Sequence, residues 1–186
     1  RAYATNSQGT AYGSQVTFKT LNENEFWWQK DTQTTVIDVT NPATGRTWMD
    51  RNLGASRAAT SSTDSEAYGD LYQWGRAADG HQKRNSLTTS IRSEGNTPGH
   101  GRFIAVAGDW RSWQNTNLWQ GVNGTNNPCP SGYRLPTIAE LKAERLSWSS
   151  NNADGAFASP LKLPMAGYRS GFDYGAIYCI DSCGDY

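Results

Sequence analysis

Two cysteines near the C-terminal end of the chain have a spacing that could support chemistry. Cys179 and Cys183 lie four positions apart, and the third cysteine, Cys129, is distant from both in the sequence. Four positions allow two cysteines to meet across a turn, within the Cα separation of about 7 Å that a disulfide requires. Asp181 and Ser182 supply residues that favour such a turn. We therefore expect a structural disulfide between Cys179 and Cys183, with one thiol left over from the odd count.

The two histidines are the next candidates for chemistry. His81 and His100 both lie in glycine-rich sequence, without the three or four closely spaced ligands that a zinc site needs. We interpret them as exposed or hydrogen-bonded loop residues, and we expect no metal and no cofactor. Asp64 and Glu66 lie near the start of a predicted helix, whose dipole accounts for paired carboxylates there. Nucleophile, metalloprotease and phosphate-binding motifs are missing from the sequence, so we expect no catalytic residues and a protein that is not an enzyme.

An aromatic and polar segment between residues 109 and 119 is the strongest candidate for a ligand-binding surface. Exposed tryptophans beside asparagine, aspartate and arginine are suited to binding sugar faces or protein surfaces. The alternative is a loop that packs its aromatic side chains inward. The two are distinguished by whether the three tryptophans of the segment face solvent together. The candidate ligand-binding residues are Asp109, Trp110, Arg111, Trp113 and Trp119.

The elements that would position these residues follow from periodicity and turn signals. Strands are predicted at 35–39 and 47–49, joined by a turn at 41–45. A helix is predicted at about 66–78, because its apolar residues recur at i, i+3, i+4 and i+7. A second helix is predicted at 137–147, where Thr137 and Glu140 form a Thr-x-x-Glu capping box.

The remaining sequence adds a long loop and a hairpin. Residues 79–134 are rich in Gly, Asn, Ser and Trp and show few strand signals. A loop of this length in a compact domain is either functional or a sign that the loop assignment is wrong. Short apolar runs at 161–168 and 175–180 predict a hairpin. We expect an α+β fold in which two helices pack on a small twisted antiparallel sheet, and we expect Trp48, Tyr72 and Leu141 to be largely buried.

Composition excludes several classes of partner. Seventeen basic and seventeen acidic residues cancel, and no basic run stands out, so we expect no nucleic-acid partner. No apolar run approaches the roughly 18 residues of a spanning helix, so we expect no transmembrane segment in this sequence. Aromatic residues make up 12% of the chain, which argues against disorder.

Residues 1–20 alternate like two strands around a turn at Asn6, Ser7 and Gly9. They resemble the last two strands of a fibronectin type III domain. We expect a hairpin with few contacts to the rest of the chain, followed by a linker at 21–34. The alternative is that the hairpin belongs to the main domain, which burial of Val16 and Phe18 against residues 35–186 would indicate.

Two further stretches carry a family resemblance. One runs from Thr47 to Ala55 and continues from Ala67 to Arg76, and the other runs from Asn127 to Thr137. In this order they resemble the Fibrobacter succinogenes major paralogous domain, over residues 35–186. That family belongs to bacterial surface and secreted proteins, many of them lipoproteins. The resemblance implies a C-type-lectin-like architecture.

The same resemblance suggests where the domain is incomplete. The family continues past a Gly-x-Tyr-Trp-Ser-Ser stretch to closing strands that carry a late cysteine, whereas this sequence stops at Tyr186. We therefore expect a truncated fragment, in which the partner that the family provides for Cys129 is missing. The alternative is a complete chain with a smaller sheet.

These expectations combine into one functional hypothesis with two alternatives. The first is a non-catalytic adhesion or binding module, extracytoplasmic and on the bacterial cell surface or secreted, with a polysaccharide or protein ligand. The second is a structural spacer or assembly domain of a surface protein. The third is an oxidoreductase of the formylglycine-generating type, which shares the C-type-lectin-like architecture. Its cysteine spacing is one residue longer, and Ile180, Asp181 and Ser182 offer no positive charge that would lower a thiol pKa.

Overall fold

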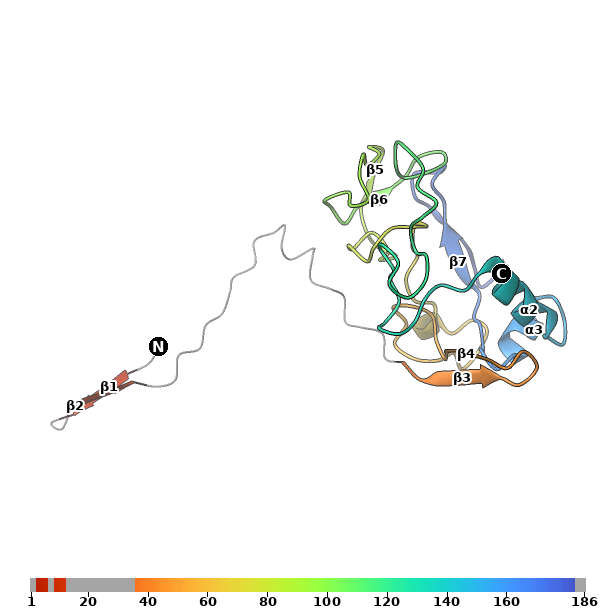
Figure 1. Cartoon of the computed structure of the whole chain (residues 1–186), viewed down its shortest axis with the longest axis horizontal. Coiled ribbons are helices and arrows are strands. Elements are labelled where there is room, and N and C mark those ends of the chain that lie inside the picture. The colour runs from red at the N-terminus through yellow and green to blue at the C-terminus, as the bar shows by residue number, and fades with distance from the viewer. Residues whose placement is uncertain (1–2, 7–8, 13–35, 183–186) are drawn as a thin grey trace.

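The computed structural model describes residues 3–6, 9–12 and 36–182 of the chain (Figure 1). They form a small mixed α/β protein with few helices and small separate two-stranded sheets. The predicted single twisted antiparallel sheet is replaced by separate strand pairs, three antiparallel and one parallel. Within the described residues no helix has the length and apolarity needed to cross a membrane.

The N-terminal hairpin is confirmed within the residues described. Strands β1 (Tyr3–Asn6) and β2 (Gly9–Tyr12) pair in antiparallel register, with Asn6 opposite Gly9. Val16, Phe18 and the predicted linker at 21–34 lie outside the described residues. The fibronectin-like assignment of this segment stays a prediction.

The second predicted hairpin is also confirmed, with its first strand shifted along the sequence. Strands β3 (Asp38–Asn41) and β4 (Arg46–Met49) are antiparallel, and Asn41 pairs with Arg46 next to the turn. The turn closes with a hydrogen bond of 2.8 Å from the Gly45 N–H to the Asn41 carbonyl. Gly45 has a φ of +65°, a conformation that glycine adopts without steric cost.

Helix α2 (Ile138–Leu146) begins at the predicted capping box. Thr137 accepts from the Glu140 N–H at 3.2 Å, and Glu140 accepts from the Thr137 N–H at 2.8 Å. The predicted inward face of this helix is wrong. Ile138 is 89% exposed and Leu141 is 39% exposed, whereas Glu144 is fully buried. Helix α2 is oriented by polar contacts with the β3–β4 hairpin instead of by its leucine and isoleucine.

The prediction of a helix at 66–78 is wrong. Only a 3₁₀ helix, η1 (Ser65–Ala67), forms there. Beyond it, the Asp70 N–H donates to the Leu53 carbonyl at 2.8 Å, and the Leu71 N–H donates to the Gln82 carbonyl at 2.8 Å. These backbone groups bind partners distant in sequence instead of the carbonyl four residues earlier. Gly69, with a φ of +67°, makes this path possible.

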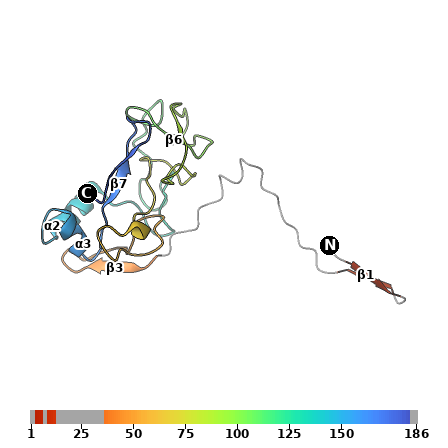
Figure 2. The ribbon, with the colours of Figure 1, turned by 180° about the vertical axis from the view of Figure 1, so that it is seen from behind.

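The C-terminal part contains one element that the sequence patterns did not predict and one that they did. Helix α3 (Ala153–Ala158) is capped by Asn152 and was not expected. Strands β7 (Ala166–Arg169) and β8 (Ile177–Ile180) form the predicted antiparallel hairpin. In both views of the ribbon β7 extends from the region of α2 and α3 toward β5 and β6 (Figures 1 and 2).

The apolar core lies in the long stretch that was predicted to be a loop. Strands β5 (Thr88–Thr89) and β6 (Phe103–Ile104) pair in parallel there. Ile104, Trp110 and Leu118 form the buried apolar cluster, and Val106 packs against it. Trp48 and Tyr72, which we expected to be largely buried, are only partly buried.

Arginine side chains hold the loops around this core. Arg169 donates to the Ser86 carbonyl at 2.7 Å and to the Gly175 carbonyl at 2.8 Å, and it lies over the Phe103 ring. Arg84 donates at 2.8 Å to the carbonyls of Gly69 and Ala166. Charge-assisted hydrogen bonds from arginines thus satisfy backbone carbonyls of the loops, which in a β-sheet would bind the N–H groups of a neighbouring strand.

Candidate functional site

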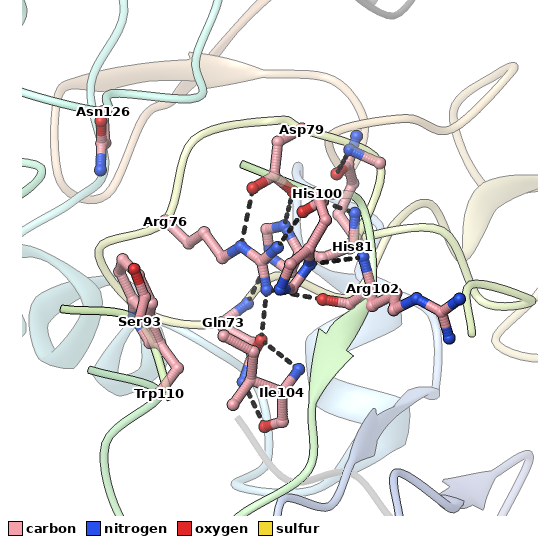
Figure 3. Close-up of polar contacts among 12 residues, drawn as sticks. Gln73, Arg76, Asp79, His81, Ser93, His100, Arg102, Ile104, Trp110 and Asn126 are labelled. Carbon is pink, nitrogen blue, oxygen red and sulfur yellow. Dashed lines mark hydrogen bonds and ion pairs between the residues drawn. The ribbon is translucent and has the colours of Figure 1, made fainter. Parts of the chain in front are cut away.

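A buried polar cluster in the loop region is centred on Arg76, whose side chain is fully buried (Figure 3). Its Nε donates to Asp79 Oδ2 at 2.8 Å. Its Nη1 donates to Gln73 Oε1 and to the Arg102 carbonyl, both at 2.9 Å. Its Nη2 donates to the His100 carbonyl at 2.7 Å. The guanidinium therefore joins its own segment, 73–79, to the segment 100–102.

His81 is the second fully buried member of this cluster. Its Nδ1 lies 2.7 Å from Asp79 Oδ1, and its Nε2 lies 3.0 Å from the backbone nitrogen of Gln73. A backbone N–H can only donate, so Nε2 accepts and Nδ1 carries the proton. The structure thus selects the neutral imidazole protonated at Nδ1. Of the two interpretations offered for the histidines, the hydrogen-bonded one holds for His81, which is not exposed.

The charges of the cluster follow from burial and pairing. Burial lowers the pKa of His81, and the hydrogen bond to Asp79 opposes that effect only in part. Burial also raises the pKa of Asp79, but the His81 hydrogen bond and the positive charge of Arg76 outweigh it and leave that pKa lowered. At neutral pH one cation, one anion and one neutral ring share the site, so buried charge is balanced.

The local sequence Asp79-Gly80-His81 builds part of this arrangement. Asp79 Oδ1 also accepts from the His81 N–H at 3.1 Å, across a bend at Gly80 with φ +103°. The chain passes so closely here that a Cβ on Gly101 would lie 2.7 Å from the Asp79 carbonyl oxygen. Short-range turn chemistry therefore places the carboxylate against the imidazole.

An aromatic cluster extends from the buried imidazole to the surface. The Tyr72 ring meets His81 edge-on, with centroids 5.8 Å apart, and it meets Trp119 at 6.3 Å. The ring centroids of Trp119 and Trp74 lie 6.0 Å apart, and the planes of the two rings are tilted by 55° to one another. Trp74 is 47% exposed, and Tyr72 and Trp119 are partly buried. We call these three residues, Tyr72, Trp74 and Trp119, the aromatic surface.

Backbone contacts from beneath fix the aromatic surface. Trp110 Nε1 donates to the Trp74 carbonyl at 2.7 Å, and Trp119 Nε1 donates to the Arg76 carbonyl at 3.2 Å. Asn126 Nδ2 donates to the Gly75 carbonyl at 2.9 Å. Rings held in this way lose little conformational freedom when a ligand binds, which favours affinity.

The five predicted ligand-binding residues do not form one surface. Trp110 is 4% exposed and belongs to the core, whereas Trp113 is 76% exposed. Trp110, Trp113 and Trp119 therefore do not face solvent together, because the Trp110 indole packs inward and supports Trp74. Trp119 joins the aromatic surface.

Asp109 and Arg111 have local and structural partners. Asp109 Oδ1 accepts from the Arg111 N–H at 2.8 Å, and the Arg111 guanidinium lies 5.9 Å from the Trp110 ring centroid. Arg111 Nη1 also donates to Asn96 Oδ1 at 2.5 Å. These two residues therefore stabilise the loop that carries Trp110.

Sequence reasoning missed Tyr72 and Trp74 as site residues because both lay within the predicted helix. The available signal was the run Tyr72-Gln73-Trp74-Gly75, in which a glycine directly follows an aromatic-rich stretch. Gly75 has a φ of +79°, and a Cβ there would lie 2.9 Å from Leu118 Cδ1. A glycine at that point could have indicated a turn instead of a helical stripe.

Cys129 and Cys179 are the two cysteines within the described residues. Cys179 is disulfide-bonded, Cys129 is a free thiol, and Cys183 lies outside the described residues. The predicted pairing of Cys179 with Cys183 stays a prediction. No group of three His, Cys, Asp or Glu side chains within 36–182 is placed to hold a metal ion. Comparison with protein-family models, curated proteins and solved structures finds no match to the chain.

Proposed function

We propose that this chain is a non-catalytic binding module of a bacterial extracytoplasmic surface protein, and that it binds its ligand at the aromatic surface. The observation that carries the proposal is the contact between the partly exposed rings of Trp74 and Trp119. Both residues are fixed by hydrogen bonds, because the Trp74 carbonyl accepts from the Trp110 indole and the Trp119 indole donates to the Arg76 carbonyl. Tryptophan and tyrosine presented rigidly are the side chains that contribute most to recognition.

The location and architecture in this proposal come from the family resemblance. The segments 67–76 and 127–137 that resemble the Fibrobacter succinogenes major paralogous domain lie on either side of the core loops, and the first of them carries Tyr72 and Trp74. A C-type-lectin-like arrangement with long loops is part of the same proposal. A cell-surface or secreted location follows from it.

The ligand class favoured by this surface is a neutral polysaccharide, with a protein as the alternative. Indole and phenol rings stack on apolar sugar faces, and the chain carries no net charge that would select an anionic ligand. Isothermal titration with a panel of soluble neutral polysaccharides tests this. Trp74→Ala is expected to weaken binding at least tenfold, about 1.4 kcal/mol.

Trp113→Ala is the matched control, because it removes an exposed tryptophan that lies outside the aromatic surface. It is expected to bind like the parent. Equal losses in the two variants would extend the site to the 109–113 loop, and unchanged binding by Trp74→Ala would exclude the aromatic surface.

A structural spacer or assembly role is the second candidate. The exposed apolar side chains of α2, Ile138 and Leu146, favour it because such residues commonly contact a neighbouring domain. The formylglycine-generating alternative needs a reactive thiolate. That alternative uses Cys179 and Cys183 as its cysteine pair, and the disulfide bond of Cys179 leaves it without a thiolate, which disfavours that chemistry.

A further inference from the structure

The backbone of Gln73 connects the buried cluster to the aromatic surface. Its N–H donates to His81 Nε2 at 3.0 Å, and its neighbours in the chain are Tyr72 and Trp74. The Gln73 side chain is also fixed, because its Oε1 accepts from the Ile104 N–H at 2.9 Å and its Nε2 donates to the Ile104 carbonyl at 2.9 Å. The position of two of the three rings therefore depends on a peptide group that His81 holds.

Protonation of His81 is incompatible with this bond. The imidazolium carries a hydrogen on each ring nitrogen, so Nε2–H would point at the Gln73 N–H. Two donors facing each other at 3.0 Å in a buried site lose a hydrogen bond and repel. The bond from Nδ1 to Asp79 survives and becomes charge-assisted. The disturbance therefore falls on the Gln73 side of the ring.

The charges around His81 set the direction of its titration. Arg76 and Arg169 carry positive charge that opposes protonation, and Asp79 carries negative charge that favours it. His100 contacts the cluster through its backbone carbonyl, which binds Arg76. Burial and the two arginines together prevail over Asp79 and lower the pKa of His81 below its ordinary 6.5.

We propose that His81 is an acid-sensitive switch for the aromatic surface, in which protonation of the imidazole releases the Gln73 amide and thereby loosens Tyr72 and Trp74. The effect on ligand affinity rests on the function proposed above. The conformational effect does not depend on any ligand.

The Glu140 carboxylate at the start of helix α2 resists protonation by acid. The pKa of Glu140 is lowered from 4.5 by hydrogen bonds from Arg134 and Thr137, so Glu140 stays ionised below that pH. The neutral His81 arrangement is fully stable above pH 6.5 and is lost as pH falls below it, because the unfolded or loosened state binds the proton more tightly. The aromatic surface should therefore change as the pH falls below 6.5, with the fold retained.

The test is a pH titration of the full chain, uniformly labelled with ¹⁵N and followed by NMR between pH 7.5 and 4. The His81 ring nitrogens, the Gln73 and Trp74 amides and the Trp119 indole are expected to shift with one common midpoint. Far-UV circular dichroism is expected to stay constant over that range. His81 titration with unmoved Gln73 and Trp74 amides would overturn the proposal, and so would loss of the far-UV signal at the same midpoint.

Two variants sharpen the result. His81→Gln keeps an acceptor for the Gln73 N–H but cannot titrate, so the Trp74 transition should disappear. His100→Gln is the matched control, because it removes the other histidine and should leave the transition in place. A transition that persists in His81→Gln contradicts the switch. If His81→Gln does not fold, the titration of the parent chain decides alone.

Ligand binding provides the last measurement. For any polysaccharide that binds at pH 7.5, the affinity of the parent chain is expected to fall with pH over the same range as the NMR transition, and that of His81→Gln is expected to change less than twofold. A pH-independent affinity would reject the coupling to the ligand. Failure to find a ligand would reject the proposed function only, since the NMR titration tests the switch independently.

Discussion

Asn41 and Glu144 lie 103 positions apart in sequence, and the Asn41 Nδ2 is 2.8 Å from both carboxylate oxygens of Glu144. One helical turn earlier, Glu140 accepts from Arg46 Nη1 at 2.7 Å. Asn41 and Arg46 are register partners at the end of the β3–β4 hairpin. Two glutamates spaced by one turn of α2 therefore bind the two residues that flank one β-turn.

Replacement of Glu144 by alanine should destabilise the protein by about 1–3 kcal/mol, because it removes both carboxylate acceptors from the buried Asn41 amide and leaves that amide only the Ser147 hydroxyl, at 2.9 Å. Urea denaturation followed by circular dichroism measures the change. Ile138→Ala, on the exposed side of the same helix, is the control and should alter stability by less than about 0.5 kcal/mol. If Ile138→Ala lowered the free energy of unfolding more than Glu144→Ala, the apolar face of α2 would be the one that packs against the protein.

Gly69→Ala tests the path of the chain after η1. A Cβ on Gly69 would lie 2.4 Å from the Leu53 carbonyl oxygen, and its φ of +67° disfavours alanine in any case. Gly132 has a φ of +87° but open space around it, so Gly132→Ala carries the backbone strain alone. We expect Gly132→Ala to cost about 1–2 kcal/mol and Gly69→Ala distinctly more. If 66–78 were a helix in solution, Gly69→Ala would instead raise the melting temperature.

Trp110→Ala and Trp113→Ala separate the two tryptophans that sequence reasoning grouped together. Loss of the buried Trp110 indole should cost about 3–5 kcal/mol, because it leaves a cavity beside Ile104 and Leu118. Loss of the exposed Trp113 should change stability by less than about 0.5 kcal/mol. Thermal melts of both variants measure this, and equal melting temperatures would contradict the assignment of Trp110 to the core.

Thiol labelling tests the cysteine assignments. Unfolded protein that has not been reduced should show one reactive thiol per chain, and peptide mapping should place it at Cys129. In the folded protein this thiol should react slowly with a disulfide reagent at neutral pH. Burial raises its pKa from 9.0 to about 11, which lowers the thiolate fraction about 100-fold. A label on Cys179 instead, with Cys129 blocked, would refute the prediction.

Local signals in the sequence were reliable where the partners are close along the chain. The capping box of Thr137 and Glu140 needs only a three-residue separation, and α2 begins where it predicts. The β7–β8 hairpin likewise follows from two apolar runs and the turn between them. Such elements carry most of their own information in a few adjacent residues.

Sequence patterns failed where a distant partner decides the outcome. The apolar spacing of Tyr68, Leu71 and Tyr72 fits a helix. The backbone N–H groups of Asp70 and Leu71 donate instead to the carbonyls of Leu53 and Gln82, respectively. The buried polar cluster around Arg76 could not be predicted from the sequence for a similar reason. Charged residues are ordinarily exposed, and nothing local indicates that the Arg76 side chain will find carbonyl acceptors on His100 and Arg102.

The small apolar cluster of Ile104, Trp110 and Leu118 also sets how the stability of the fold responds to temperature. Exposure of apolar surface on unfolding raises the heat capacity, and exposure of polar groups lowers it. Around this cluster, unfolding uncovers Arg76, Asp79, His81 and Gln82 together with the apolar residues. The heat-capacity increment per residue should therefore fall below the usual value of about 12–15 cal/mol/K. The curve of unfolding free energy against temperature is accordingly broad and shallow. Cooling should therefore lower the stability of this fold less than it lowers that of a domain with a large apolar core.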